Sequence, residues 1–298
     1  MNSAKQEDFY PEDELKSKSQ KISTDYSFTS VSVLCWVMTS PGNLFTKAIH
    51  ITQTWGTKCN LTLYVTSEEP DRPFPGKVLT LPVKEGRNAL WNKTKAAFSY
   101  IHTLYRDRYD WFLKADDDSF IIVDNLRYFL ASKNTFEPVL YGALFHLPTE
   151  LYDIDYMSGG AGYVMGRETL NRFMDVAFDE KKCPSDEKLA SFAEDVYIGY
   201  CLSKVAVRLE STLDSLDRIR FLPIEADLIV RGTVDTWVPK YLKQNFSTGV
   251  ACCSDYLIST HRIKPDWMYF MHFVSHHLRL ASQSKHHNYL IDGKVIPI

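Results

Sequence analysis

The stretch Trp111-Phe112-Leu113-Lys114-Ala115-Asp116-Asp117-Asp118 runs from a mostly apolar segment straight into three consecutive carboxylates. Apolar residues resume directly afterwards at Phe120-Ile121-Ile122-Val123, so core-forming sequence brackets the acids on both sides. Adjacent carboxylates repel one another and resist leaving water, and a divalent cation relieves both costs. We therefore expect a buried strand that ends at a metal site. For an Asp triplet taken alone, a solvated acidic turn is the alternative.

Length and composition favour a globular protein. The chain has 298 residues, 45% of them hydrophobic, with a formal net charge of −3. That charge gives no reason to expect a nucleic-acid partner, and no apolar run approaches the roughly 18–20 residues of a membrane span. We expect a polar, disordered stem over residues 1–29, one folded domain over 30–281 and a polar tail over 282–298.

Strand-like and helix-like segments alternate along the first half of the chain. The expected strands are 30–38, 61–66 and 77–83, followed by the strand that runs from Trp111 into the acids. The expected helices are 44–54, 88–105 and 124–131, the last with Asp124 as its N-cap. This alternation is typical of an α/β fold, in which a mostly parallel sheet carries helices on both faces.

The second half contains fewer regular signals. A strand is expected over 139–144, helices over 166–178 and 189–205, a short strand over 256–260 ending at His261, and a helix over 265–280. In that last helix the inward residues should be Met268, Met271, Val274 and Leu278. Residues 223–250 show no clear period and are interpreted as a long functional loop region.

Small residues dominate the segment Tyr156-Met157-Ser158-Gly159-Gly160-Ala161-Gly162-Tyr163. Such residues let the backbone approach a ligand or another element closely. A bulged strand packed on its neighbour is the alternative interpretation.

Several of these segments together resemble one known family. They are Leu34–Thr39, Lys47–His50, Thr54–Gly56, Lys84–Gly86, Trp111–Asp118, Tyr156–Tyr163, Glu194-Asp195 and Cys252–Asp255. In this order they resemble the core 1 β-1,3-galactosyltransferases of glycosyltransferase family 31, over about residues 30–280. The Trp111–Asp118 and Tyr156–Tyr163 runs are the specific ones, since a lone Asp-x-Asp is a weak signal.

This resemblance implies a GT-A fold, UDP-galactose as donor and Mn²⁺ as cofactor. It implies an inverting transfer of galactose, in β-1,3 linkage, to GalNAc that is O-linked to Ser or Thr of glycoproteins. It also implies a lumenal Golgi membrane protein, and the family is often homodimeric. The alternatives are a related β-1,3-glycosyltransferase with a different acceptor, and an inactive paralogue that acts as a chaperone or binds sugars.

By the same similarity, Asp116, Asp118 and His261 are the expected metal ligands and Asp195 the expected general base. Oxygen and nitrogen donors together suit Mn²⁺ better than Mg²⁺, and an inverting displacement needs a base for the acceptor hydroxyl. The expected nucleotide contacts are Met38, Thr39, Lys84, Glu85, Gly86, Lys95 and Asp117. The expected sugar contacts are Tyr156, Gly159, Gly160, Glu194 and Trp237.

Six cysteines are present: Cys35, Cys59, Cys183, Cys201, Cys252 and Cys253. The absence of a C-x-x-C motif argues against a zinc ribbon. Cys35 with Cys59, and Cys183 with Cys201, are plausible bridges, and the resemblance favours a vicinal disulfide over a thiol pair at Cys252-Cys253. An even cysteine count, together with sequons at Asn60, Asn92 and Asn245, indicates an oxidising lumen.

The chain departs from the family pattern where the acceptor is expected. The family has Ser-Phe-His-Tyr-Val where this chain has Ser259-Thr260-His261-Arg262-Ile263, and an arginine is missing from Leu213–Asp217. The aromatic segment before the cysteine pair is reduced to Trp237, Tyr241 and Phe246. We expect donor handling to be retained and the use of a simple GalNAc acceptor to be weaker.

Overall fold

A computed structural model describes residues 28–148, 153–183, 193–244 and 246–279, with two short strands at 289–291 and 294–296. The predicted stem before residue 28 and most of the predicted tail lie outside the described residues, as do the sequon residue Asn245 and the first part of the helix predicted over 189–205.

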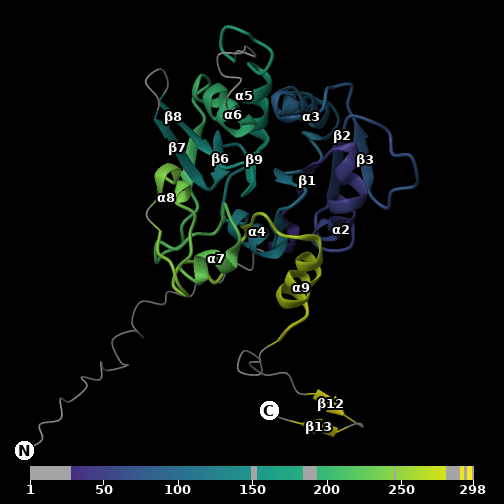
Figure 1. Ribbon diagram of the computed structural model, residues 1–298, viewed down its shortest axis with the longest axis vertical. Helices are drawn as coiled ribbons and strands as arrows, with labels where there is room; N and C mark the ends of the chain where they lie inside the picture. Colours follow the sequence, from purple (N-terminus) through teal and green to yellow (C-terminus); the bar gives the residue numbers. More distant parts are fainter. Residues whose placement is uncertain are drawn as a thin grey trace, which may run out of the picture.

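A seven-stranded sheet forms the centre of the molecule (Figure 1). In spatial order its strands are β10 (Arg208–Ser211), β6 (Val139–Gly142), β9 (Tyr163–Gly166), β4 (Trp111–Asp116), β1 (Val33–Met38), β2 (Leu61–Thr66) and β3 (Lys77–Thr80). Strand β9 is antiparallel to both of its neighbours, and the other neighbouring pairs are parallel. The prediction of a mixed, mostly parallel sheet is confirmed.

Helices cover both faces of this sheet (Figure 1). One face carries α3 (Leu90–Tyr105), α5 (Arg167–Met174) and α6 (Glu194–Ser203). The opposite side carries α2 (Ile49–Thr52), α4 (Val123–Leu130) and α9 (Pro265–His276). Shorter helices are α1 (Pro41–Asn43), α7 (Ala226–Val230) and α8 (Trp237–Tyr241), with single helical turns at 28–30, 44–48, 55–58 and 87–89.

Strand β1 shows how a continuous apolar run serves two cores. All six of its residues are buried. Its odd-numbered side chains, from Val33 to Val37, belong to the core beside α4, and its even-numbered ones, from Leu34 to Met38, belong to the core beneath α3, α5 and α6. Because successive side chains of a strand point to opposite faces, a strand covered on both sides needs apolar residues throughout.

Three small antiparallel pairs complete the fold. They join β5 (Phe120–Ile121) to β11 (Ser259–Thr260), β7 (Leu144–Pro148) to β8 (Asp153–Met157), and β12 (Tyr289–Ile291) to β13 (Lys294–Ile296). The β5–β11 pair brings the C-terminal part of the domain directly beside the residues that follow the Asp triplet.

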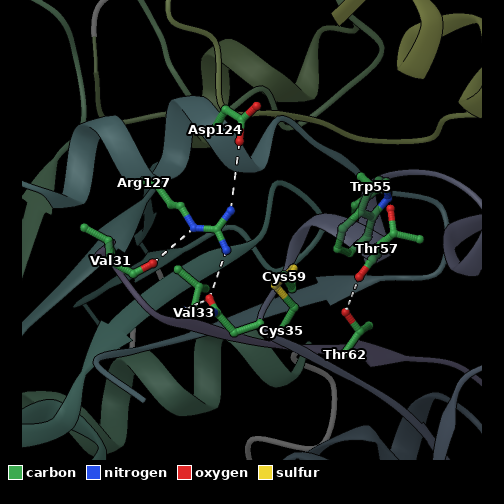
Figure 2. Close-up of a disulfide and its surroundings, with 12 residues drawn as sticks. Val31, Val33, Cys35, Trp55, Thr57, Cys59, Thr62, Asp124 and Arg127 are labelled. Carbon is green, nitrogen blue, oxygen red and sulfur yellow. Dashed lines mark hydrogen bonds and ion pairs between the residues drawn. A yellow bond between two sulfur atoms is a disulfide. The ribbon is translucent and has the colours of Figure 1, made fainter. Parts of the chain in front are cut away.

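Disulfides join Cys35 to Cys59, Cys183 to Cys201 and Cys252 to Cys253, which confirms all the predicted pairings. Figure 2 shows the first of them beside Arg127 of α4, whose guanidinium donates to the carbonyl of Val31 and pairs with Asp124. A chain with three disulfides and no free cysteine fits an oxidising compartment.

Some local predictions were wrong. Asp124 lies in the first turn of α4 and Ile122 is the N-cap. Residues 223–250 contain α7 and α8, which are too short to produce a visible period. In α9 Met268 is buried as predicted, but Val274 is exposed. The helix ends at His276, so Leu278 lies beyond it and is exposed as well. Within the described residues, no helix is both long and apolar enough to cross a bilayer.

Candidate active site

The site is built at the carboxyl ends of two neighbouring parallel strands. Strands β1 and β4 end side by side, with Met38 opposite Asp116. Thr39 therefore follows next to Asp117, and its hydroxyl donates to the buried Asp117 carboxylate at 2.9 Å. Burial raises the pKa of Asp117, although the ammonium of Lys47 acts against this shift. Ligands commonly bind at this edge of an open α/β sheet.

Three side chains form a group that could hold a metal ion: Asp116, Asp118 and His261, with one ligand atom of each lying within 4.8 Å of the others. The Nε2 atom of His261 lies 3.2 Å from Asp118 and 3.9 Å from Asp116. Burial alone would raise the pKa of Asp118. The hydrogen bond and the charge of His261 outweigh burial and lower the pKa of Asp118 to about 2.

The imidazole of His261 is oriented for such a role. Its Nδ1 atom lies 3.1 Å from the carbonyl oxygen of Pro223, which can hold a proton on Nδ1. Nε2 is then the atom that can bind a metal ion once it has lost the proton that it shares with Asp118. That carbonyl is the kind of second partner that metal-binding histidines use. Oxygen and nitrogen donors converging in this way fit a divalent cation such as Mn²⁺.

Gly160 makes room for this imidazole. A Cβ built on Gly160 would lie 2.1 Å from the His261 ring, which no side chain tolerates. Ser119 fixes the same turn, because its hydroxyl donates to the carbonyl of Gly160 at 2.8 Å and accepts from the amide of Asp116. The small residues therefore let the backbone approach another part of the structure closely, here the His261 ring, as predicted.

The carboxylate of Asp195 lies on the other side of the same cavity, in the first turn of α6. It accepts the amide N–H of Gly159 at 2.7 Å and that of Val196 at 3.0 Å. Burial raises its pKa against these hydrogen bonds. A carboxylate with a raised pKa that faces a cavity is suited to accept a proton.

A buried ion-pair group lies between the two carboxylate sites. The ammonium of Lys114 contacts Asp116 at 2.7 Å and Glu194 at 2.6 Å. Burial raises the pKa of Glu194 to about 7, against the pull of Lys114. The hydroxyl of Tyr163 also lies near Glu194, at 3.3 Å. Glu194 is therefore shielded by its partners, whereas Asp195 is partly open to the cavity.

A cavity of about 1040 Å³ connects these groups. At one end it is lined by Met38, Thr39, Glu85, Gly86 and Arg87. Sequence reasoning missed Lys93, which is buried and donates from its ammonium to the carbonyl of Thr39 and to the Glu85 carboxylate. Only the local pattern of α3, where a lysine falls among core residues, could have indicated it.

Two of the expected nucleotide contacts, Lys84 and Lys95, do not line this cavity. Lys84 is exposed and absent from the lining. Lys95 places its ammonium over the rings of Trp91 and Phe178. Because residues two apart on a helix point about 200° apart, α3 directs Lys93 into the site and Lys95 away from it.

Aromatic side chains line the opposite end. Phe145, Tyr156, Trp237 and Tyr241 lie there, with the Phe145 ring 5.6 Å from Tyr156 and 6.1 Å from Trp237. The guanidinium of Arg262 lies 5.4 Å from the centre of the Trp237 ring, and both residues donate to the Asp235 carboxylate at 3.0 Å. An apolar wall with a few polar groups suits the ring of a sugar.

A mixed, mostly parallel sheet with an acidic cluster at the ends of its strands is the arrangement expected of a GT-A fold. Residues 37–222 match the Fringe-like family. The chain belongs to the Fringe-like family of glycosyltransferases.

Named relatives agree with this assignment. Glycoprotein-N-acetylgalactosamine 3-beta-galactosyltransferase 1 of Xenopus laevis is 39% identical over 253 residues, which cover 84% of this chain and 67% of the frog protein. Human chondroitin sulfate synthase 3 is 27% identical over 185 residues, 56% of this chain and 20% of that protein. Human beta-1,3-glucosyltransferase is 24% identical over 157 residues, 53% of this chain and 30% of that protein.

Proposed function

We propose that this protein transfers galactose from UDP-galactose, in β-1,3 linkage and with inversion, onto GalNAc that is O-linked to Ser or Thr of glycoproteins. The observation that carries the proposal is the placement of Asp195 across one cavity from Asp116, Asp118 and His261. The 39% identity with the frog galactosyltransferase supports this donor and this acceptor.

Each end of the cavity has a role in this reaction. Asp116, Asp118 and His261 would hold Mn²⁺, which neutralises charge on the leaving diphosphate when it is bound. Thr39, Glu85, Gly86 and Arg87 line the end suited to the nucleotide. Asp195 takes the proton of the attacking GalNAc hydroxyl, and its raised pKa strengthens it as a base near neutral pH.

The aromatic end would orient the acceptor. Trp237 and Tyr241 offer apolar surface for the face of the GalNAc ring, and Tyr156 lines the same wall. Arg262, which stands where the family has tyrosine, changes this wall and favours a second candidate, a β-1,3-glycosyltransferase with a different acceptor. A non-enzymatic role as a chaperone would not require the ligand set and the base together. The three disulfides are consistent with a lumenal Golgi enzyme.

Release of UDP tests the proposal directly. Protein expressed with its disulfides should release UDP from UDP-galactose when a GalNAc-Thr peptide and Mn²⁺ are present, and the product should carry a β-1,3 linkage by NMR. Transfer only to other acceptors would support the second candidate. Binding of UDP without turnover on any acceptor would leave the non-enzymatic role.

A further inference from the structure

Lys114 is a buried lysine whose side chain lies between the proposed metal ligand Asp116 and Glu194, the neighbour of the proposed base. Its side chain is 2% exposed. On β4 it points to the same face of the sheet as Asp116, because residues two apart on a strand share a face. Its ammonium reaches Asp116 Oδ1 at 2.7 Å on one side and Glu194 Oε1 at 2.6 Å on the other.

Gly159 extends this connection to the proposed base. Its carbonyl lies 3.3 Å from the Lys114 ammonium, and its amide donates to Asp195 at 2.7 Å. A Cβ on Gly159 would lie 2.9 Å from Glu194 and 3.1 Å from the ammonium. The Lys114 ammonium therefore contacts the carboxylate of Asp116, the carboxylate of Glu194 beside the base on α6, and the carbonyl of Gly159, the residue whose amide holds the base.

We propose that Lys114 is a positioning residue that fixes the separation between Asp116 and Asp195. The inference rests on the proposed function, because only a transfer reaction needs these two carboxylates at a set distance. An in-line displacement requires the donor and the attacking hydroxyl to be held together, and a shift of 1 Å can reduce the rate about 100-fold.

A purely structural role for Lys114 makes a different prediction. In that case the ammonium only neutralises buried Glu194, and removing both charges together should restore the protein, since a buried ion pair can often be replaced by neutral groups of similar size. If Lys114 positions the site, the doubly neutral protein should fold and still react slowly.

The experiment compares Lys114→Met, Glu194→Gln and the double variant with the parent. Lys77→Met, at an exposed position on β3 that does not line the cavity, is the control for loss of a lysine. Lys114→Met alone should lower Tm, because it leaves Glu194 buried without its partner. The double variant should regain most of that Tm, while kcat stays at least about 100-fold below the parent and the Kd for UDP with Mn²⁺ changes less than about 5-fold.

Hydrogen exchange of the metal-free protein gives a readout that does not depend on activity. In the double variant the Gly159 amide should exchange at least about 10-fold faster, while the amides of β1 and β4 keep their protection. A double variant with parental kcat, or with unchanged exchange at Gly159, would overturn the proposal. If the parent itself fails to transfer galactose, the proposed function fails, and the exchange at Gly159 still decides whether Lys114 holds this peptide in place.

Discussion

Asp195 combines an open face toward the cavity with two amide donors that fix its carboxylate. Asp195→Asn keeps the size and polarity of the side chain but cannot accept a proton. We expect turnover to fall by roughly 10²–10⁴, the usual range for loss of a general base, with UDP binding retained. Steady-state kinetics and calorimetry measure the two effects, and Asp227→Asn on exposed α7 is the control. A variant within a few-fold of the parent would transfer the role to another residue, Glu194 first.

The pH dependence of turnover tests the same carboxylate. The base must be ionised to act, so activity should be lost as the pH falls through its pKa. Burial raises the pKa of Asp195, and the loss should therefore occur above the value of about 4 that is usual for aspartate. Measurement of kcat against pH, over a range where the protein stays folded, would contradict this assignment if the acid limb lay at or below that value.

Adding one methyl group at Gly160 tests the proposed metal-binding group of Asp116, Asp118 and His261. In Gly160→Ala the added Cβ would collide with the His261 ring and displace its Nε2 from Asp116 and Asp118. We expect UDP binding in Mn²⁺ to weaken at least about tenfold, roughly the effect of disturbing the groups that orient a metal ligand. Gly42→Ala is the matched control, since nothing lies within 4 Å of its added Cβ. Equal UDP affinity in the two variants, measured by calorimetry, would contradict the role given to His261.

At the scale of elements, α8 and the β7–β8 pair make the aromatic wall. Trp237→Ala should raise the acceptor KM and leave the donor KM nearly unchanged, because the groups at the donor end come from the ends of β1 and β4 and from the turn before α3. The Trp237 ring also packs 6.1 Å from Phe145, so thermal unfolding must be followed in parallel. Trp267→Ala, on the exposed side of α9, is the control. A rise in both KM values together with a lower Tm would show that Trp237 only anchors the loop.

The elements that could be predicted are those whose own sequence carries the signal. Strand β1 is a continuous apolar run, β2 and β4 are mostly apolar, and α3 keeps a helical period, so their positions agree with the structure. Strand β10 was missed because Arg208–Ser211 lies at the edge of the sheet and is exposed or half-buried. Its place depends on pairing with β6, which a local pattern cannot report.

The residues of the candidate site also divide into those with a local sequence signal and those that only tertiary contacts place. The acids of β4 and the glycines near 160 could be chosen from sequence, because each is a local anomaly. The contact of His261 with the acids depends on the β5–β11 pairing and came from family resemblance alone. Sequence alone could not show that Lys93, and not Lys95, contacts Thr39 at the site. That depends on which face of α3 packs toward β1, which only the tertiary structure fixes.

At the scale of the whole molecule, the proposed metal-binding group of Asp116, Asp118 and His261 joins two distant parts of the chain. Asp116 ends β4 and Asp118 follows it, whereas His261 follows β11 in the C-terminal part of the domain. A cation bound only by the folded state should therefore raise Tm, with a gain of about 2.7 kcal/mol at 100 times its Kd. Scanning calorimetry with and without Mn²⁺ measures this gain. Asp118→Ala should lose it, and an equal rise in that variant would place the cation elsewhere.

The β5–β11 pair also determines when, during synthesis of the chain, Asp116 and Asp118 can acquire their nitrogen partner His261. A chain emerges from the ribosome N-terminus first, and Asp116 and Asp118 emerge long before His261. Until Ser259 and Thr260 dock beside Phe120 and Ile121, the carboxylates lack their nitrogen partner. A nascent chain can thus acquire most of its central sheet before this group of three side chains is complete, and the group cannot form until His261 has been made.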